Sequence, residues 1–194
     1  MAANAPARTA ARRIRSTVLA ALVIVSATLI VVVTGRWVGP SLTSSSSAAS
    51  VRRGVTVFDE KSPAVTRLDP ALRRALRLAA RDAAQYRVEI VVNSGWRSPE
   101  YQERLLGRAV LQYGSEEKAA RWVATADTSA HVSGHAVDIG PSRATAWLSR
   151  HGAEYGLCQI YRNEPWHYEL RPEAVDDGCP SMYANPRHDP RMHQ

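Results

Sequence analysis

The stretch Ser129–Gly140, SAHVSGHAVDIG, places an imidazole (His131) and a carboxylate (Asp138) on either side of a glycine. A second stretch, Glu164–His167 (EPWH), adds another carboxylate and another imidazole. Two His and one Asp are nitrogen and oxygen donors of the kind that Zn²⁺ accepts. A hydrolytic zinc site needs three such ligands, an open position and a nearby base. We therefore expect a metal site here, with Glu164 as the base.

Each of these residues taken alone is weak support for a site. A single loop His is more often structural than a ligand. His135 lies four residues from His131 and is an alternative ligand. If the chain from Gly134 to Ile139 is extended, His135 and Asp138 point to opposite faces, so we expect His135 at the rim or in solvent. Gly134 is expected to let the backbone turn close to the metal.

Local signals predict the helices and strands that carry these residues. Asp69 and Pro70 are typical of a helix start, and Ser98 and Pro99 repeat that signal. The predicted helices are Pro70 to about Tyr86, Pro99–Tyr113, Ser115–Thr125 and Ser142–Glu154, and the predicted strands are Val88–Asn93, His135–Ile139, Leu157–Arg162 and Trp166–Leu170.

The first 50 residues differ in composition from the rest. Residues 1–16 are rich in Ala and Arg and form an expected cytoplasmic arm, and residues 17–36 contain an uncharged run of 19 residues, Thr17–Gly35. A bilayer core takes about 20 residues, and the preceding arginines favour a cytoplasmic N-terminus. We expect a single-pass anchor, which leaves the rest of the chain outside the cytoplasm. A cleaved signal peptide, whose apolar part is usually about 7–15 residues, is the less favoured alternative. A buried core helix is the least favoured, because the run is apolar on all faces.

Residues 37–50 are Ser-rich and predict a flexible linker. We expect the folded domain at residues 51–180 and an irregular tail at residues 181–194. The chain carries a net charge of +7, but five of its 25 basic residues precede Val51 without an acid, which leaves 20 basic against 18 acidic residues. A domain so close to neutral is a poor candidate for a nucleic-acid partner, because phosphate binding needs a concentrated basic face.

Two cysteines, Cys158 and Cys179, do not form a CxxC pair, so a thiolate zinc knuckle is not expected. Outside the cytoplasm they are expected to form a disulfide, which would stabilise the fold by about 3 kcal/mol. Two free buried thiols are the alternative.

Three motifs follow one another along the chain: SGWRS with Gln102, SAHVSGHAVDI, and EPWHYEL. Together they resemble the zinc D-alanyl-D-alanine carboxypeptidases of the VanY-like branch of peptidase family M15. That pattern runs from about Asn93 to Leu170, and all of its positions are present in order. The resemblance implies a small α+β domain with an antiparallel sheet and helices on one side. It also implies one Zn²⁺ per domain, bound by His131, Asp138 and His167.

By the same resemblance Glu164 is the catalytic base, and Arg97 steadies the oxyanion or the substrate carboxylate. Ser129 and Gln102 would help to build the substrate pocket, and the implied substrate is a peptidoglycan stem peptide ending in D-Ala-D-Ala. Arg162 is a second candidate cation for the terminal carboxylate. Two alternatives stay open: an endopeptidase of the same family, and a wall-binding module without catalysis.

Overall fold

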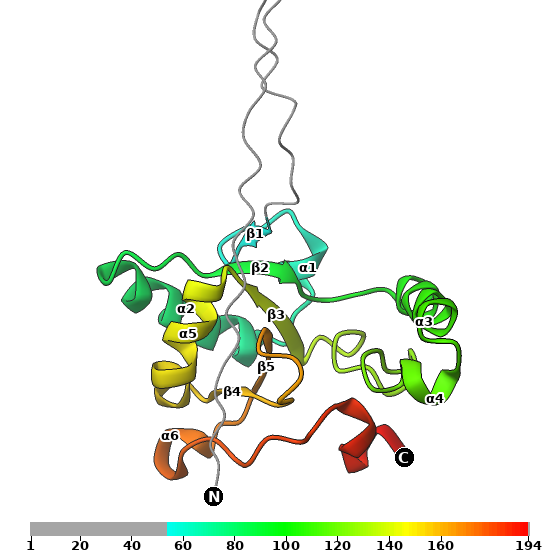
Figure 1. Cartoon of the computed structure of the whole chain (residues 1–194). Helices are drawn as coiled ribbons and strands as arrows, with labels where there is room; N and C mark the ends of the chain where they lie inside the picture. The colour runs from blue at the N-terminus through cyan, green and yellow to red at the C-terminus, as the bar shows by residue number, and fades with distance from the viewer. Residues whose placement is uncertain (1–53, 194) are drawn as a thin grey trace, which may run out of the picture. The chain divides into compact units, whose positions relative to one another are not determined.

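The computed structural model describes residues 54–193, and these form a five-stranded antiparallel sheet in the order β1-β2-β3-β5-β4 (Figure 1). The sheet is combined with helices, so the expected α+β class is confirmed. The strands are β1 (Val55–Thr56), β2 (Val91–Ser94), β3 (Ala136–Gly140), β4 (Leu157–Gln159) and β5 (His167–Leu170).

Six α-helices and three short 3₁₀ helices are described between residues 54 and 193. The α-helices are α1 (Pro63–Thr66), α2 (Pro70–Gln85), α3 (Pro99–Tyr113), α4 (Glu116–Ala119), α5 (Ser142–His151) and α6 (Ala174–Asp177). The 3₁₀ helices are η1 (Gly152–Tyr155), η2 (Pro186–His188) and η3 (Pro190–His193).

The starts of α2 and α3 are confirmed, because both depend on local capping. The Asp69 carboxylate accepts hydrogen bonds from the amides of Ala71 (2.8 Å) and Leu72 (2.9 Å), ahead of Pro70. Ser98 accepts one from the amide of Tyr101 at 3.2 Å. These bonds satisfy amides that have no partner inside the helix.

Other predicted boundaries were wrong. The helix expected over Ser115–Thr125 ends at Ala119, and the chain then turns so that the Ala124 carbonyl accepts a hydrogen bond from Gln102 at 2.9 Å. Ser142 is the first residue of α5 but makes no capping bond, and the α-helix ends at His151, where η1 follows. β2 starts at Val91 and β4 ends at Gln159, so both strands are shorter than predicted.

The hydrophobic core lies between one face of the sheet and helices α2 and α5, which Figure 1 shows on the same side of the strands. α2 contributes Leu72 and Leu76, while the sheet contributes Val137, Ile139 and Tyr168, all almost fully buried. Strand side chains alternate between faces, so Asp138 and His167, which pair across β3 and β5, point to the opposite face. The fold thus offers one apolar face to its core and one polar face to a site.

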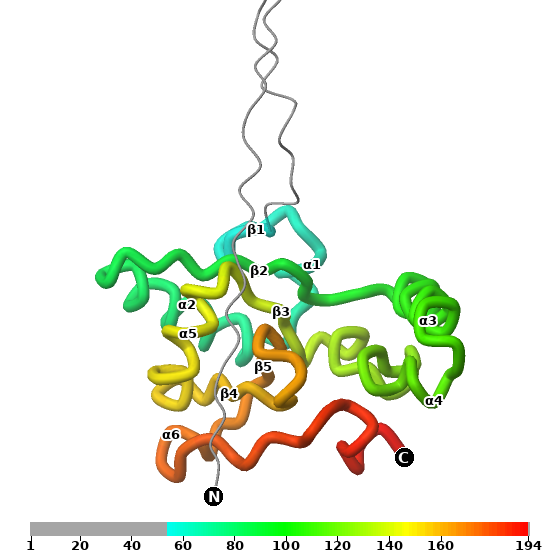
Figure 2. The backbone as a smooth tube through the Cα atoms, viewed as in Figure 1, coloured from blue at the N-terminus to red at the C-terminus, as the bar shows by residue number. Residues whose placement is uncertain are grey.

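The C-terminal segment returns along the sheet (Figure 2). Cys158 and Cys179 form a disulfide, and Tyr183 pairs with the strand-like residues Ile160 and Arg162 through two backbone hydrogen bonds of 2.9 Å. These contacts attach the C-terminal segment to the sheet. The tail was expected to be irregular, but it contains η2 and η3.

Within residues 54–193, no helix is both long and apolar enough to traverse a bilayer. The predicted arm (1–16), anchor (17–36) and linker (37–50) lie outside the described residues.

Candidate metal centre

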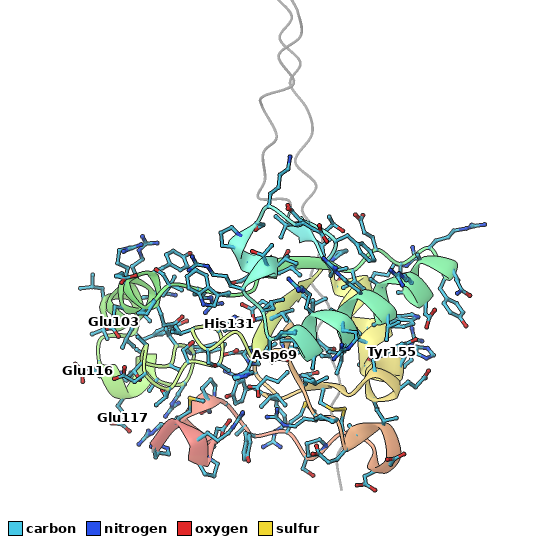
Figure 3. The ribbon with its side chains drawn as sticks, turned by 180° about the vertical axis from the view of Figure 1, so that it is seen from behind. Asp69, Glu103, Glu116, Glu117, His131 and Tyr155 are labelled. Atoms are coloured by element: carbon cyan, nitrogen blue, oxygen red, sulfur yellow. A yellow bond between two sulfur atoms is a disulfide. The ribbon has the colours of Figure 1, made fainter. Side chains whose placement is uncertain are left out.

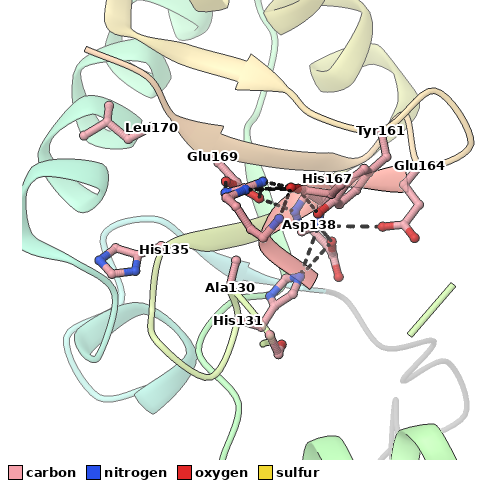
Figure 4. A network of polar contacts seen from close by, with 12 residues as sticks. Ala130, His131, His135, Asp138, Tyr161, Glu164, His167, Glu169 and Leu170 are labelled. Atoms are coloured by element: carbon pink, nitrogen blue, oxygen red, sulfur yellow. Dashed lines mark hydrogen bonds and ion pairs between the residues drawn. The ribbon is translucent and has the colours of Figure 1, made fainter. Parts of the chain in front are cut away.

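The side chains of His131, Asp138 and His167 meet at one point on the polar face of the sheet (Figure 4). His131 Nε2 lies 3.3 Å from His167 Nδ1 and 3.3 Å from Asp138 Oδ1, and His167 Nδ1 lies 3.4 Å from that same oxygen. Ligands about 2.0–2.1 Å from a tetrahedral Zn²⁺ are separated by about 3.3–3.4 Å. The triangle therefore has the dimensions of one face of a zinc coordination tetrahedron.

The outer nitrogen of each imidazole has its own partner. His131 Nδ1 lies 2.9 Å from the Gly95 carbonyl oxygen, which can only accept, so Nδ1 carries the proton. His167 Nε2 lies 3.2 Å from Glu169 Oε1, a buried carboxylate. If both outer nitrogens donate, Nε2 of His131 and Nδ1 of His167 present lone pairs to the centre of the triangle.

These atoms fit a bound cation. Asp138 Oδ1 is buried and accepts no hydrogen bond from the described residues, although two imidazole nitrogens lie close to it. Lone pairs converging in a buried space repel one another unless a positive charge lies between them. The donor set of two imidazoles and one carboxylate suits Zn²⁺.

The electrostatics of the three groups agree with this. Burial holds the pKa of His131 below its usual value, which keeps the ring neutral and able to bind a metal. Burial opposes ionisation of Asp138, but the adjacent His131 and His167 outweigh it and hold its pKa well below the usual range. Burial also opposes charging of His167, yet hydrogen bonds to Asp138 and Glu169 raise its pKa to about 9. Carboxylates that favour a proton on His167 would also favour a divalent cation.

Arg97 contacts the other oxygen of Asp138. Its Nη2 donates to Asp138 Oδ2 at 2.6 Å, its Nε donates to Ser94 Oγ at 2.8 Å, and its Nη1 donates to Gln102 Oε1 at 3.2 Å. Arg97 therefore orients the carboxylate so that Oδ1 faces the triangle. A guanidinium has five N–H groups, so two remain for a further partner.

Glu164 lies on the open side of the triangle, in the turn before β5 (Figure 4). Its Oε2 is 3.7 Å from His167 Nδ1, and its Oε1 is buried without a hydrogen-bond donor among the described residues. Burial raises its pKa to about 7, with Asp138 adding to the shift and His167 and Arg97 opposing it. Such a carboxyl group can both accept and release a proton near neutral pH.

A cavity of about 280 Å³ opens over these residues. Arg97 is the one Arg or Lys among the described residues that line it. Ser129 and Gln102 also line the cavity, and Gln102 is fixed between Arg97 and the Ala124 carbonyl. Arg162, the other candidate cation, does not line it; its guanidinium donates to the Met182 carbonyl at 2.9 Å.

His135 lies apart from the three converging residues and points away from them in Figure 4, with Nδ1 3.0 Å from Ser133 Oγ. The expectation that it stays out of the metal site is met, since the group that can hold a metal is His131, Asp138 and His167. The predicted turn at Gly134 is present, but the close approach that excludes a Cβ is to the loop before α2 and not to the metal-type residues. The φ of 78° at Gly134 and the Arg67 carbonyl, 2.6 Å from where a Cβ would lie, require glycine for packing against the start of α2.

Acidic residues elsewhere do not join the group. Figure 3, seen from behind, shows Glu103, Glu116 and Glu117 on α3 and α4, well to one side of His131. The metal-type cluster is thus confined, within residues 54–193, to the polar face of β3 and β5 and the loop before β3.

Sequence reasoning missed the residues that support the ligands. Gly95 lies within the SGWRS motif, but its carbonyl role depends on a loop 36 residues away. Glu169 lies two residues after His167. Residues two apart in a strand point to the same face, so this spacing could have indicated that Glu169 lies beside His167. Asp189 and Arg191 of the tail gave no signal at all, and they reach the site only through folding.

Residues 65–173 match the family profile VanY, described as D-alanyl-D-alanine carboxypeptidase. A D-alanyl-D-alanine carboxypeptidase of Enterococcus faecalis (strain ATCC 700802 / V583) is 28% identical to this chain, over 53% of the chain and 46% of that relative. The matched part is therefore about half of the relative's length.

Solved structures similar to this chain include two VanY proteins. The first is the vancomycin resistance D,D-pentapeptidase VanY of a VanB-type cassette, a Glu-to-Ala mutant in complex with Zn(II). It has a TM-score of 0.50 and 26% identity, covering 53% of this chain and 72% of that one. The second, VanYB in complex with D-alanine-D-alanine, has a TM-score of 0.53 and 24% identity, covering 57% and 74%. The second likeness shows the fold alone.

Proposed function

Because the chain belongs to the VanY family of D-alanyl-D-alanine carboxypeptidases, we propose that it is a zinc-dependent peptidase that removes the terminal D-Ala of peptidoglycan stem peptides. The observation that carries the proposal is the triangle of His131, Asp138 and His167, with edges of 3.3–3.4 Å, beside the buried Glu164. The similar protein solved with Zn(II) supports zinc as the ion.

His131, Asp138 and His167 would hold the ion through Nε2, Oδ1 and Nδ1. Zn²⁺ bound there supplies a Lewis acid, which polarises a peptide carbonyl and makes water more acidic.

Glu164 is the general base and then the general acid. Its carboxylate accepts a proton from the attacking water and passes that proton to the nitrogen of the departing D-Ala. Burial supports this role, because a pKa of about 7 makes both transfers possible near neutral pH.

Arg97 binds negative charge in the cavity with the two N–H groups that Asp138, Ser94 and Gln102 leave free. That charge is the oxyanion of the transition state or the carboxylate of the terminal D-Ala. Gln102 acts by holding Arg97, and the buried Ser129 forms part of the cavity wall.

The test is incubation of the full-length protein, in detergent, with a stem pentapeptide ending in D-Ala-D-Ala, with zinc or with a chelator. Mass spectrometry should show zinc-dependent release of free D-Ala. Cleavage at an internal bond instead would identify an endopeptidase, and binding without cleavage would identify a wall-binding module. A pentapeptide ending in L-Ala is the matched control and should remain intact.

We also propose that residues 17–36 anchor the protein in the cytoplasmic membrane, with the N-terminus inside and the peptidase domain outside. The uncharged run Thr17–Gly35 and the arginines before it support this, and the outer side is where stem peptides are found. Protease added to intact spheroplasts should degrade residues 54–193. Complete protection would refute the orientation.

A further inference from the structure

The C-terminal strap, residues 179–193, runs from the disulfide at Cys179 to Met192, which lines the cavity over the metal-type residues. Figure 2 traces it from α6 past β4 toward α4. The disulfide to Cys158 and the backbone pairing of Tyr183 fix its first half. Its second half carries Asp189 and Arg191.

Asp189 is fully buried, so its carboxylate needs partners. Tyr161 donates its hydroxyl to Asp189 Oδ2 at 3.0 Å, and Arg191 Nε donates to both carboxylate oxygens at 3.0 Å. Arg191 Nη2 donates to Oδ2 as well. These bonds hold the guanidinium of Arg191 in one orientation.

The same guanidinium contacts both oxygens of Glu169. Arg191 Nη1 donates to Oε2 at 2.7 Å, and Nη2 donates to Oε1 at 3.3 Å. Arg171 contacts Oε2 alone, at 2.7 Å. Arg191 is thus the arginine of this cluster that also reaches Oε1, the oxygen that lies 3.2 Å from His167 Nε2.

We propose that Arg191 is a positioning residue for the metal: by clamping Glu169 it holds the Nε2 proton of His167 outward and its Nδ1 toward the ion. The inference rests on the proposed function, since the ion is the zinc of that site. A buried carboxylate with a free torsion could turn away from the imidazole, and a two-point clamp prevents this. The last residues of the strap therefore form part of the metal centre.

The experiment measures zinc binding rather than hydrolysis. The dissociation constant of the full-length protein is obtained by competition with a chromophoric chelator, and the visible spectrum is recorded after Co²⁺ substitution. Arg191→Gln should weaken zinc binding by about 10–100-fold and alter the Co²⁺ spectrum. A purely structural strap would lower thermal stability but leave both readouts unchanged.

Arg187→Gln is the matched control. It lies in the same strap and pairs with Glu117 on α4, but both side chains are exposed. Zinc affinity and the Co²⁺ spectrum should match the wild type.

Arg191→Lys keeps the charge but cannot clamp two oxygens, so it should weaken zinc binding less than Arg191→Gln. If Arg191→Gln does not fold, the zinc affinity and the Co²⁺ spectrum of Arg191→Lys test the proposal instead. Wild-type affinity in every folded Arg191 variant would overturn the inference alone. Absence of zinc binding by the wild type would instead overturn the proposed function and the inference with it.

Discussion

Alternate residues of strands β3 and β5 point to opposite faces of the sheet, and different interactions fix the side chains on each face. Val137, Ile139 and Tyr168 face α2 and α5 and are held by apolar burial. Asp138 and His167 face the cavity and are held by individual polar partners. Apolar burial has no direction, so the core face tolerates substitutions that keep its volume and its apolar character. The site face depends on atoms placed within a few tenths of an ångström.

The comparison implies that damage to one face should spare the other. Substitutions on the site face should remove metal or activity from a folded protein. Substitutions on the core face should lower stability and leave the metal in place.

The largest effect is expected from His131→Ala, which removes one corner of the metal triangle. The purified variant should lose its zinc on dialysis, measured by atomic absorption, and should release no D-Ala. His135→Ala is the matched control and should keep both, because His135 lies outside the triangle. Zinc retained at full stoichiometry in His131→Ala would contradict the ligand assignment.

Glu164→Gln should separate catalysis from metal binding. It removes the proposed proton acceptor without removing a corner of the triangle, so turnover should fall by roughly 10²–10⁴-fold. Zinc content should stay at the wild-type value. Near-normal hydrolysis in this variant would show that another group moves the proton.

Ile139→Ala should affect the core face only. Ile139 is 1% exposed, and a truncation of this kind costs about 2–5 kcal/mol of unfolding free energy. Denaturant unfolding should show this loss, while the folded variant binds zinc with unchanged stoichiometry. Loss of zinc from the folded variant would show that the faces are coupled.

Removal of the metal should destabilise the protein by an amount near the lower end of the range expected for Ile139→Ala. A ligand present at 100 times its dissociation constant stabilises by about 2.7 kcal/mol, and a chelator should remove that contribution. Thermal unfolding with and without chelator measures it. Ile139→Ala should show the same difference as the wild type, and His131→Ala should show none.

The smallest effect is expected at acid pH, through Asp189. Burial opposes its ionisation, but hydrogen bonds from Arg191 outweigh this and hold its pKa below the usual 3.8. The ionised Asp189 therefore stabilises the folded protein at pH values above the usual pKa of 3.8. This stabilisation is lost as the pH falls through the lower pKa of the folded state. Between about pH 6 and about pH 3, Asp189→Asn should lose less thermal stability than the wild type. An equal loss in both proteins would show that Asp189 does not cause the loss of stability at acid pH.

Elements with local signals were predicted well. α3 begins where Ser98 and Pro99 predicted, and it ends at Tyr113 as expected, because capping involves atoms a few residues apart. α4 was predicted too long, because the chain after Ala119 follows a contact with Gln102 that lies 22 residues away in sequence. Contacts of that kind leave no local pattern.

The sequence by itself determined the class of the fold, the start of α2, the whole of α3, and the donors His131, Asp138 and His167, since residue type decides which atoms can bind a metal. Tertiary structure alone decided that these donors converge, that the Gly95 carbonyl and Glu169 orient the two imidazoles, and that Arg191 reaches Glu169 from the end of the chain. The reason is physical: capping and alternation act over a few residues. The distances within the metal centre depend on where the sheet and the C-terminal strap bring distant backbone together.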